Sequence, residues 1–122
     1  MTILDSNVIL RIMRGEKEVK RFVENHSDTI GTTIFNVYEL LRGKGVILDY
    51  FKGFEIYGFS ESEARVAAEI YRKLKSSGKM KGEIDILIAS IVKANGETII
   101  TIDKDFIEIG KIVQIDVLTP SS

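Results

Sequence analysis

The sequence predicts an α/β fold with a mainly parallel sheet that is covered by helices on both faces. The first observation behind this prediction is an alternation of short β-prone runs with segments whose apolar residues recur at helical spacing. The second is that the 122 residues contain no repeat, low-complexity segment or long linker, which predicts a single domain over residues 1–122. In such sheets, functional groups gather beyond the carboxyl ends of the strands.

The first half of the chain opens with a strand signal that is followed by two helix signals. The apolar run from Met1 stops at Asp5, and Asp5, Ser6 and Asn7 are residues of the kind that cap helix N-termini. Apolar residues at helical spacing continue to about Gly15, and a second helical segment follows directly. A short β-prone run then separates this second helix from the third. We expect strands over residues 1–4 and 29–32, and helices over residues 8–15, 16–25, 34–42 and, as one or two turns, 46–51.

The second half has clearer boundaries between its elements. Residues 54–59 alternate as a strand does, and Ser60 and Glu63 have the spacing of a capping box. Gly78 and Gly96 stand where two helices should end. We expect strands over residues 54–59, 97–102 and 112–117, and helices over residues 60–77, 83–94 and 104–109.

The composition restricts the kinds of metal site that the chain can hold. There is no cysteine, which excludes disulfides, thiolate nucleophiles and thiolate zinc sites. With a single histidine, His26, a site built from several histidines is also excluded. Any metal ion must therefore be held mainly by oxygen, which favours Mg²⁺, Mn²⁺ or Ca²⁺.

The net charge of −1 gives the molecule no global attraction for nucleic acid, so any RNA-binding residues must be gathered locally. Arg11, Arg14 and Arg42 flank acid-bearing segments and are the preferred candidates, although ordinary solvated surface charge explains each of them as well. Lys44, Lys79 and Lys81 are further candidates. No run approaches the length of a membrane span, and the first residues do not resemble a signal peptide, so we expect a cytoplasmic protein.

Acidic residues stand at the ends of two predicted strands and inside two apolar helices. Asp5 follows the first strand and Asp103 follows the strand that ends at Ile102, so both should emerge at one edge of a parallel sheet. Glu39 and Asp85 lie among apolar neighbours in their helices, and Asp105 follows Asp103 by two residues and is the fifth candidate.

Each acid also has a structural explanation. Asp5 and Asp103 can cap the helices that follow them, and Asp85 near a helix N-terminus gains from the helix dipole. Glu39 and Asp105 can be solvated surface residues. Together, however, converging carboxylates would repel one another unless a cation compensates them. The interpretation that unites the acids is a Mg²⁺-type site that activates water for phosphodiester hydrolysis.

The motifs resemble those of the PIN-domain family, and in particular the VapC toxins of prokaryotic toxin–antitoxin pairs. The matching segments are Asp5-Ser6-Asn7 after a hydrophobic strand, Glu39 in Tyr-Glu-Leu-Leu-Arg-Gly, Asp85 in Asp-Ile-Leu-Ile-Ala-Ser, and residues 101–106. Each motif is weak alone, but the four occur in the family's order across nearly the whole chain.

The resemblance implies a PIN-like three-layer α/β/α sandwich with a central, mainly parallel five-stranded sheet of order 3-2-1-4-5. It implies a Mg²⁺- or Mn²⁺-dependent endoribonuclease acting on structured RNA such as tRNA or rRNA, inhibited by a VapB-type antitoxin and forming a homodimer. The acidic quartet would be Asp5, Glu39, Asp85 and Asp103, with Asp5 and Asp103 as direct metal ligands. Ser6, Asn7 and Thr101 would orient carboxylates or water.

Two alternative functions remain open at this point. A catalytically inactive PIN-like binding module normally lacks one or more of the acids, and none of the four is missing here. A receiver-like phosphoacceptor signalling domain would need paired acids after the first strand and a lysine after the fifth. Only Asp5 stands after the first strand, and no lysine follows Val117.

Overall fold

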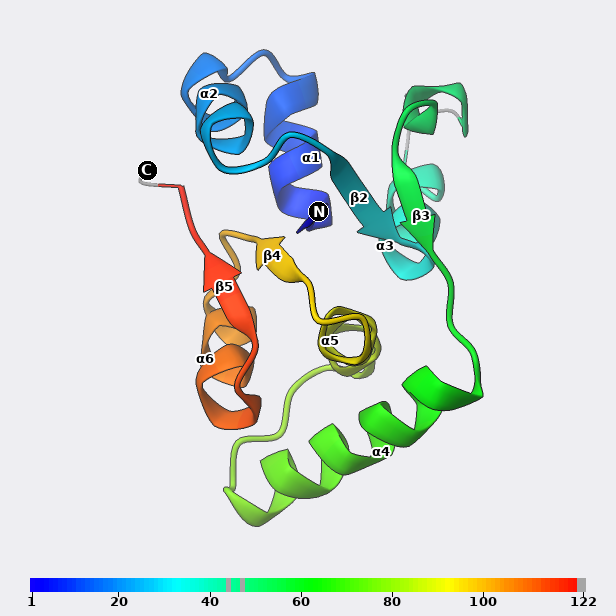
Figure 1. Ribbon diagram of the computed structural model, residues 1–122, viewed down its shortest axis with the longest axis vertical. Coiled ribbons are helices and arrows are strands. Elements are labelled where there is room, and N and C mark those ends of the chain that lie inside the picture. The colour runs from blue at the N-terminus through cyan, green and yellow to red at the C-terminus, as the bar shows by residue number, and fades with distance from the viewer. Residues whose placement is uncertain (44, 47, 121–122) are drawn as a thin grey trace.

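The computed structural model describes residues 1–43, 45–46 and 48–120 and contains a five-stranded, all-parallel sheet (Figure 1). The strand order β3-β2-β1-β4-β5 confirms the order implied by the family resemblance. β1 lies at the centre and pairs with β2 on one side and with β4 on the other. The strands are β1 (Thr2–Leu4), β2 (Ile30–Thr33), β3 (Glu55–Tyr57), β4 (Thr98–Ile100) and β5 (Asp116–Leu118).

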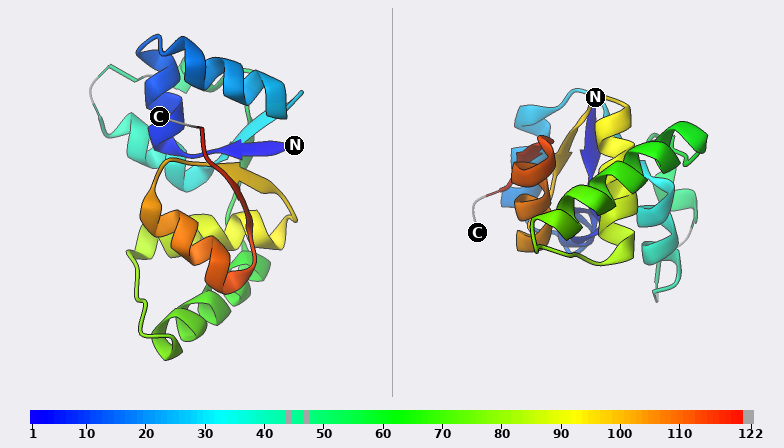
Figure 2. Two further views of the ribbon diagram at one scale, coloured as in Figure 1. Left: turned by 90° about the vertical axis from the view of Figure 1, so that its left-hand side faces the viewer. Right: turned by 90° about the horizontal axis from the view of Figure 1, so that it is seen from below.

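Helices cover both faces of this sheet, which confirms the predicted α/β/α sandwich (Figure 2). The alternation of side chains along a strand divides the core in two. Ile3 and Ile99 face α4, α5 and α6, whereas Leu4 and Ile100 face α1, α2 and α3. The helices are α1 (Ser6–Met13), α2 (Lys17–His26), α3 (Ile34–Leu41), the 3-10 helix η1 (Leu48–Phe51), α4 (Glu61–Ser76), α5 (Glu83–Ala94) and α6 (Lys104–Val113). Among the described residues, no helix has the length and apolar character that crossing a bilayer would require.

The helix boundaries of the first half follow the capping signals. Asp5 is the N-cap of α1 and Thr33 the N-cap of α3, where Thr33 and Asn36 form a capping box. The weak helical signal over residues 46–51 corresponds to η1, whose Phe51 anchors it in the core. Ile47, which belongs to the same predicted segment, lies outside the described residues.

The prediction of a strand over residues 112–117 was wrong at its start, and the preceding helix was predicted too short. α6 continues to Val113 because Phe106, Ile109 and Val113 bury one continuous face at helical spacing. The helix ends at Gln114, which has a left-handed backbone with φ of 61°. Within α6, Gly110 lets β5 approach closely, since an added Cβ would lie 2.6 Å from a methyl carbon of Val117. β4 is likewise shorter than the predicted span of residues 97–102.

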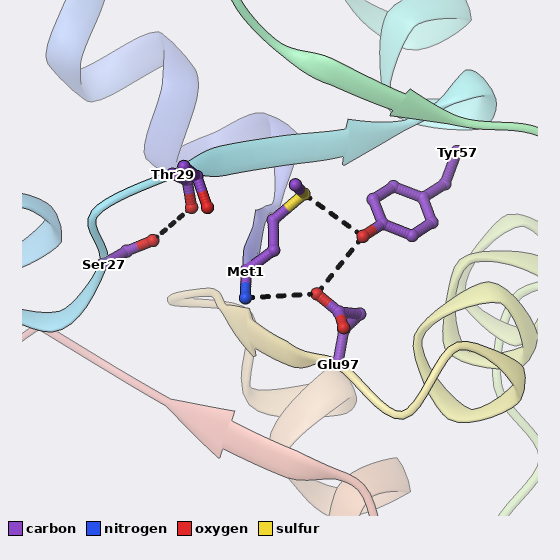
Figure 3. A network of polar contacts seen from close by, with 5 residues as sticks. All are labelled: Met1, Ser27, Thr29, Tyr57 and Glu97. Carbon is purple, nitrogen blue, oxygen red and sulfur yellow. Dashed lines mark hydrogen bonds and ion pairs between the residues drawn. The ribbon is translucent and has the colours of Figure 1, made fainter.

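A polar cluster ties together the amino-terminal edge of the sheet, away from the predicted acidic site (Figure 3). The Tyr57 hydroxyl donates to Glu97 Oε2 at 3.2 Å, and the Met1 amino group lies 3.6 Å from the same oxygen. The Tyr57 ring reaches them by crossing β2 over Gly31, where an added Cβ would lie 3.1 Å from a ring carbon. Close to this edge, the Ser27 hydroxyl donates to the Thr29 carbonyl (Figure 3). None of these contacts was predicted from the sequence.

Candidate acidic site at the switch point of the sheet

Asp5 is the buried centre of the candidate site, and its side chain is 5% exposed. It follows β1 directly, at the point where the chain connections leave the sheet in opposite directions. Its Oδ1 accepts hydrogen bonds from the Ser6 backbone N–H at 2.8 Å and from Asn36 Nδ2 at 2.9 Å, and its Oδ2 accepts from the Thr101 hydroxyl at 2.6 Å. Burial raises the pKa of Asp5, and these three donors partly oppose that rise.

Thr101 connects the ends of β1 and β4. While its hydroxyl donates to Asp5, it accepts hydrogen bonds from the Asp103 backbone N–H at 3.1 Å and from Asn7 Nδ2 at 3.4 Å. Asp103 is the N-cap of α6, and its Oδ1 accepts from the Asp105 backbone N–H at 2.9 Å. The structural explanation of Asp5 and Asp103 as helix caps is therefore correct, and it leaves part of each carboxylate available for another partner.

Glu39 reaches the site through Ser6. The Ser6 hydroxyl donates to Glu39 Oε1 at 2.9 Å and accepts from Asn36 Nδ2 at 2.9 Å. Asn36 thus donates to both Ser6 and Asp5, and it is completely buried. Glu39 is half-buried at the site, so the interpretation of it as a fully solvated helix residue is wrong.

Asn36 belongs to the candidate site by its contacts but was not predicted from the sequence. Its own carbonyl oxygen accepts from the Thr33 hydroxyl at 2.7 Å, which fixes the side chain so that its amide points at the acids. A Thr–x–x–Asn spacing directly after a β-prone run was available as a signal, because polar residues at a strand-to-helix junction often form capping boxes. The sequence alone gives no sign that the amide would also face Asp5.

Asp85 lies in the first turn of α5, as expected, and is half-buried. Its pKa is raised to about 6, first by burial and then by the negative charges of the other candidate acids. In decreasing order of effect, these acids are Asp103, Asp5, Glu39 and Asp105. The predicted convergence of the acids is therefore present: acids that follow β1 and β4 and an acid of α3 influence the carboxyl group on α5.

The negative charge of the quartet has no internal counterion in the described part of the chain. No ion pair recorded there involves Asp5, Glu39, Asp85 or Asp103. Nor do three or more potential ligands among the described residues form a ready-made metal cluster. The donor set of carboxylate oxygens nevertheless suits Mg²⁺ or Mn²⁺, since Mg²⁺ usually takes one or two carboxylates and keeps several waters.

The candidate RNA-binding residues are only partly gathered at the site. Arg11 lies 3.6 Å from Glu16, and Arg14 is the C-cap at the opposite end of α1 from Asp5. Arg42 is closer, one turn after Glu39, and its guanidinium lies over the Tyr38 ring at 5.2 Å from the ring centroid. Lys44 lies outside the described residues.

Asp105 and Lys81 lie at one border of the site and contact each other. Asp105 is 63% exposed, and its Oδ1 lies 3.3 Å from the Lys81 ammonium. That ammonium also lies 2.7 Å from Glu108 Oε1, and the Lys81 side chain is 14% exposed. Lys79, two residues earlier, is exposed. The two lysines were equivalent candidates for RNA binding in the sequence, but in the structure Lys81 is paired with two carboxylates and Lys79 is exposed.

The raised pKa of Asp85 predicts how the stability of the metal-free protein depends on pH. Between pH 3.8 and about 6 the folded protein binds a proton at Asp85 that the unfolded chain has released. The protonated Asp85 carboxyl therefore stabilises the folded protein at low pH, and this stabilisation is lost as the pH rises through about 6. After allowance for solvent screening, we expect a loss of about 1–2 kcal/mol in the free energy of unfolding.

Asp85→Asn should remove this dependence. Urea unfolding in EDTA is expected to show the variant gaining about 1–2 kcal/mol over wild type at about pH 7.5 and little at about pH 4. Asp116→Asn removes an exposed carboxylate at the amino-terminal edge of the sheet and is the matched control. A gain of equal size at both pH values would contradict the assigned shift.

Comparison with known proteins places this arrangement in a family. The PIN domain family model matches residues 2–112. Ribonuclease VapC3 of Methanocaldococcus jannaschii is 29% identical over 92 residues, which is 73% of this chain and 95% of that protein.

Solved structures share the whole fold. A chain in the crystal structure of FitAcB from Neisseria gonorrhoeae superimposes with a TM-score of 0.83 at 24% identity, covering 98% of each chain. A chain of VapBC2 from Rickettsia felis, bound to a DNA fragment from its promoter, gives 0.81 at 20% identity and covers 97% of each chain. With the family model spanning nearly the entire sheet and every acid of the quartet, the chain belongs to the PIN domain family.

Proposed function

We propose that this chain is a metal-dependent, single-domain endoribonuclease and the toxin of a VapBC-type toxin–antitoxin pair. The observation that carries the proposal is the convergence of Asp5, Glu39 and Asp103 on the half-buried Asp85, with no cation paired to any of them in the described part of the chain. The similarity to a ribonuclease VapC3 over most of both chains supports the nuclease activity.

In this proposal, Asp5 and Asp103 hold Mg²⁺ or Mn²⁺ directly, and Glu39 and Asp85 bind through water or serve a second ion. When bound, such an ion would orient and activate a water for attack on the phosphodiester and offset the charge that develops on phosphorus. The residues of the chain would fix the orientation of the carboxylates by hydrogen bonds. Three donors fix Asp5, Ser6 fixes Glu39, and Thr101 couples the ends of β1 and β4.

Structured RNA such as tRNA or rRNA is the proposed substrate, and Arg42 is the best-placed of the candidate arginines to contact its phosphates. A VapB-type antitoxin is the proposed partner, because VapBC complexes are among the structures that share the fold. We further propose that the protein acts in the cytoplasm.

The experiment that tests the nuclease activity is cleavage of total tRNA and rRNA by the purified protein, with Mn²⁺ or with EDTA. Discrete fragments with Mn²⁺ that disappear with EDTA would support the proposal. Intact RNA under both conditions, from a protein that still binds Mn²⁺, would instead favour a catalytically inactive PIN-like module. Fragments that persist in EDTA would contradict metal dependence.

We also propose that the chain forms a homodimer through α3. Ile34, Tyr38 and Leu41 lie on one face of that helix at helical spacing and are 43%, 53% and 38% exposed. An apolar stripe of this kind is suited to a two-fold interface in which it packs on its own copy. Light scattering should show a dimer for wild type and a monomer for Tyr38→Glu. Tyr71→Glu, at a tyrosine exposed on α4, should leave the dimer intact.

A further inference from the structure

The loop of residues 77–82 between α4 and α5 leads directly into the turn that carries Asp85. The backbone N–H groups of its first three residues donate to carbonyls of α4, whereas the Lys79 side chain is exposed and Met80 is 45% exposed. The loop and α6 come from separate parts of the chain, yet the first turn of α6 is adjacent to Asp103. The relative position of Asp85 and Asp103 therefore depends on whatever connects this loop to α6.

The connection is the side chain of Lys81, which is 14% exposed. Its ammonium forms an ion pair with Glu108 Oε1 at 2.7 Å and donates to Asp105 Oδ1 at 3.3 Å, so it bridges one turn of α6. In the described part of the chain, these are the only ion pairs between the loop and α6. Both carboxylates favour the charged amine, and the pKa of Lys81 is raised mainly by its hydrogen bond to Glu108.

We propose that Lys81 is a positioning residue: with Glu108 and Asp105 it fixes the start of α5, which bears Asp85, against the start of α6, which bears Asp103. The metal-binding consequence rests on the proposed function. Lys81 acts through the two helix starts and does not itself touch the RNA or the metal ion.

This role competes with two other roles that the sequence left open. A Lys81 that bound RNA phosphate would have to leave two carboxylates and the covered position that it occupies. An Asp105 that served as a fifth metal ligand would have to give up the ammonium, whereas Asp103 has no ion pair to lose. The contacts therefore favour Asp105 as the partner of Lys81 over a role as a fifth metal ligand.

Hydrogen exchange in EDTA tests the positioning role without any metal or activity. Lys81→Gln should accelerate the exchange of amides in residues 86–88, the first hydrogen-bonded amides of α5, by roughly three- to tenfold, since local opening becomes easier when a tie is removed. Lys81→Arg should restore slow exchange because it keeps the charge. Lys79→Gln removes the same charge from an exposed position of the same loop and is the matched control. Unchanged exchange in Lys81→Gln would overturn the proposal.

Mn²⁺ titration calorimetry distinguishes a positioning role from a purely structural one. Lys81→Gln should weaken Mn²⁺ binding roughly three- to tenfold while its metal-free melting temperature stays near that of wild type, and Lys81→Arg should recover the affinity. Asp105→Asn should stay within about twofold of wild type, whereas a direct ligand would lose far more. Full Mn²⁺ affinity in Lys81→Gln would overturn the positioning role.

Failure of the proposed function would give a different pattern. A wild-type protein that binds no Mn²⁺ would overturn the metal nuclease, while faster exchange in Lys81→Gln would still support the role of Lys81 in fixing the two helix starts. A Lys81→Gln protein with wild-type exchange and wild-type Mn²⁺ binding would overturn the inference and leave the nuclease intact.

Discussion

Replacing Asp5 by asparagine is expected to reduce RNA cleavage by at least about 10²–10³-fold while the fold is retained. Asp5 is the innermost acid of the site, and both of its oxygens are held by donors from three different elements. The asparagine carbonyl can keep the bonds from Ser6 and Asn36. Its amide would face the Thr101 hydroxyl, which could accept from it only by releasing the long hydrogen bond from Asn7. The carboxylate charge, which is the part that a metal ion needs, is lost.

The melting temperature separates this effect from misfolding. Because the substitution removes a buried charge and weakens one hydrogen bond, the free energy of unfolding should change by no more than about 1 kcal/mol in either direction. Asp116→Asn should cleave RNA as wild type does. Equal cleavage by wild type and Asp5→Asn would mean that the fragments come from a contaminant, or that the acidic site is not where the reaction occurs.

Mn²⁺ is expected to raise the melting temperature of the wild-type protein by a large amount. An ion present at about one hundred times its dissociation constant adds about 2.7 kcal/mol to the free energy of unfolding if only the folded chain binds it. For a chain of this size the shift corresponds to roughly 8–16 °C. The quartet should bind this strongly because the ion supplies the positive charge that the described residues around Asp85 do not.

Variants and a change of pH test whether the shift in melting temperature comes from Mn²⁺ bound at the quartet. Asp5→Asn and Asp103→Asn should lose most of the shift, and Asp116→Asn should keep it. The shift should also be smaller at about pH 5 than at about pH 7.5, because below pH 6 a proton competes with the ion at Asp85. A shift of the same size in every variant would indicate binding outside the quartet, and no shift in wild type would contradict the metal site.

Most of the fold follows from local sequence features. Caps at Asp5, Thr33 and Ser60 mark helix starts, and the apolar periodicity defines which faces are buried. The error over residues 112–117 arose where a β-prone sequence, Ile112-Val113, extends a buried helical face. Burial beside Phe106 and Ile109 outweighs the β preference of those residues, and the pattern of the segment alone does not reveal that outcome.

Three members of the quartet were predicted from positions after strands or in the first turn of a helix, where backbone topology alone brings them to one edge of the sheet. Such positions are determined by the order of elements along the chain. Glu39, in the second half of α3, was predicted from its apolar neighbours and from the family resemblance. The orientation of the supporting side chains depends instead on contacts between residues that are far apart in the sequence. Asn36 donates to Asp5 across 31 positions of sequence, and Thr101 donates to it across 96.

The sequence by itself thus determined the fold class and the family, and it predicted the candidate acids. The tertiary structure decided which polar groups hold each acid, that Asp85 carries the raised pKa, and that Lys81 and Asp105 pair with each other. These outcomes depend on distances of about 3 Å between residues far apart in the chain. Hydrogen bonds and charge interactions change steeply over such distances, while the periodicity of a sequence specifies only which face of an element a residue occupies.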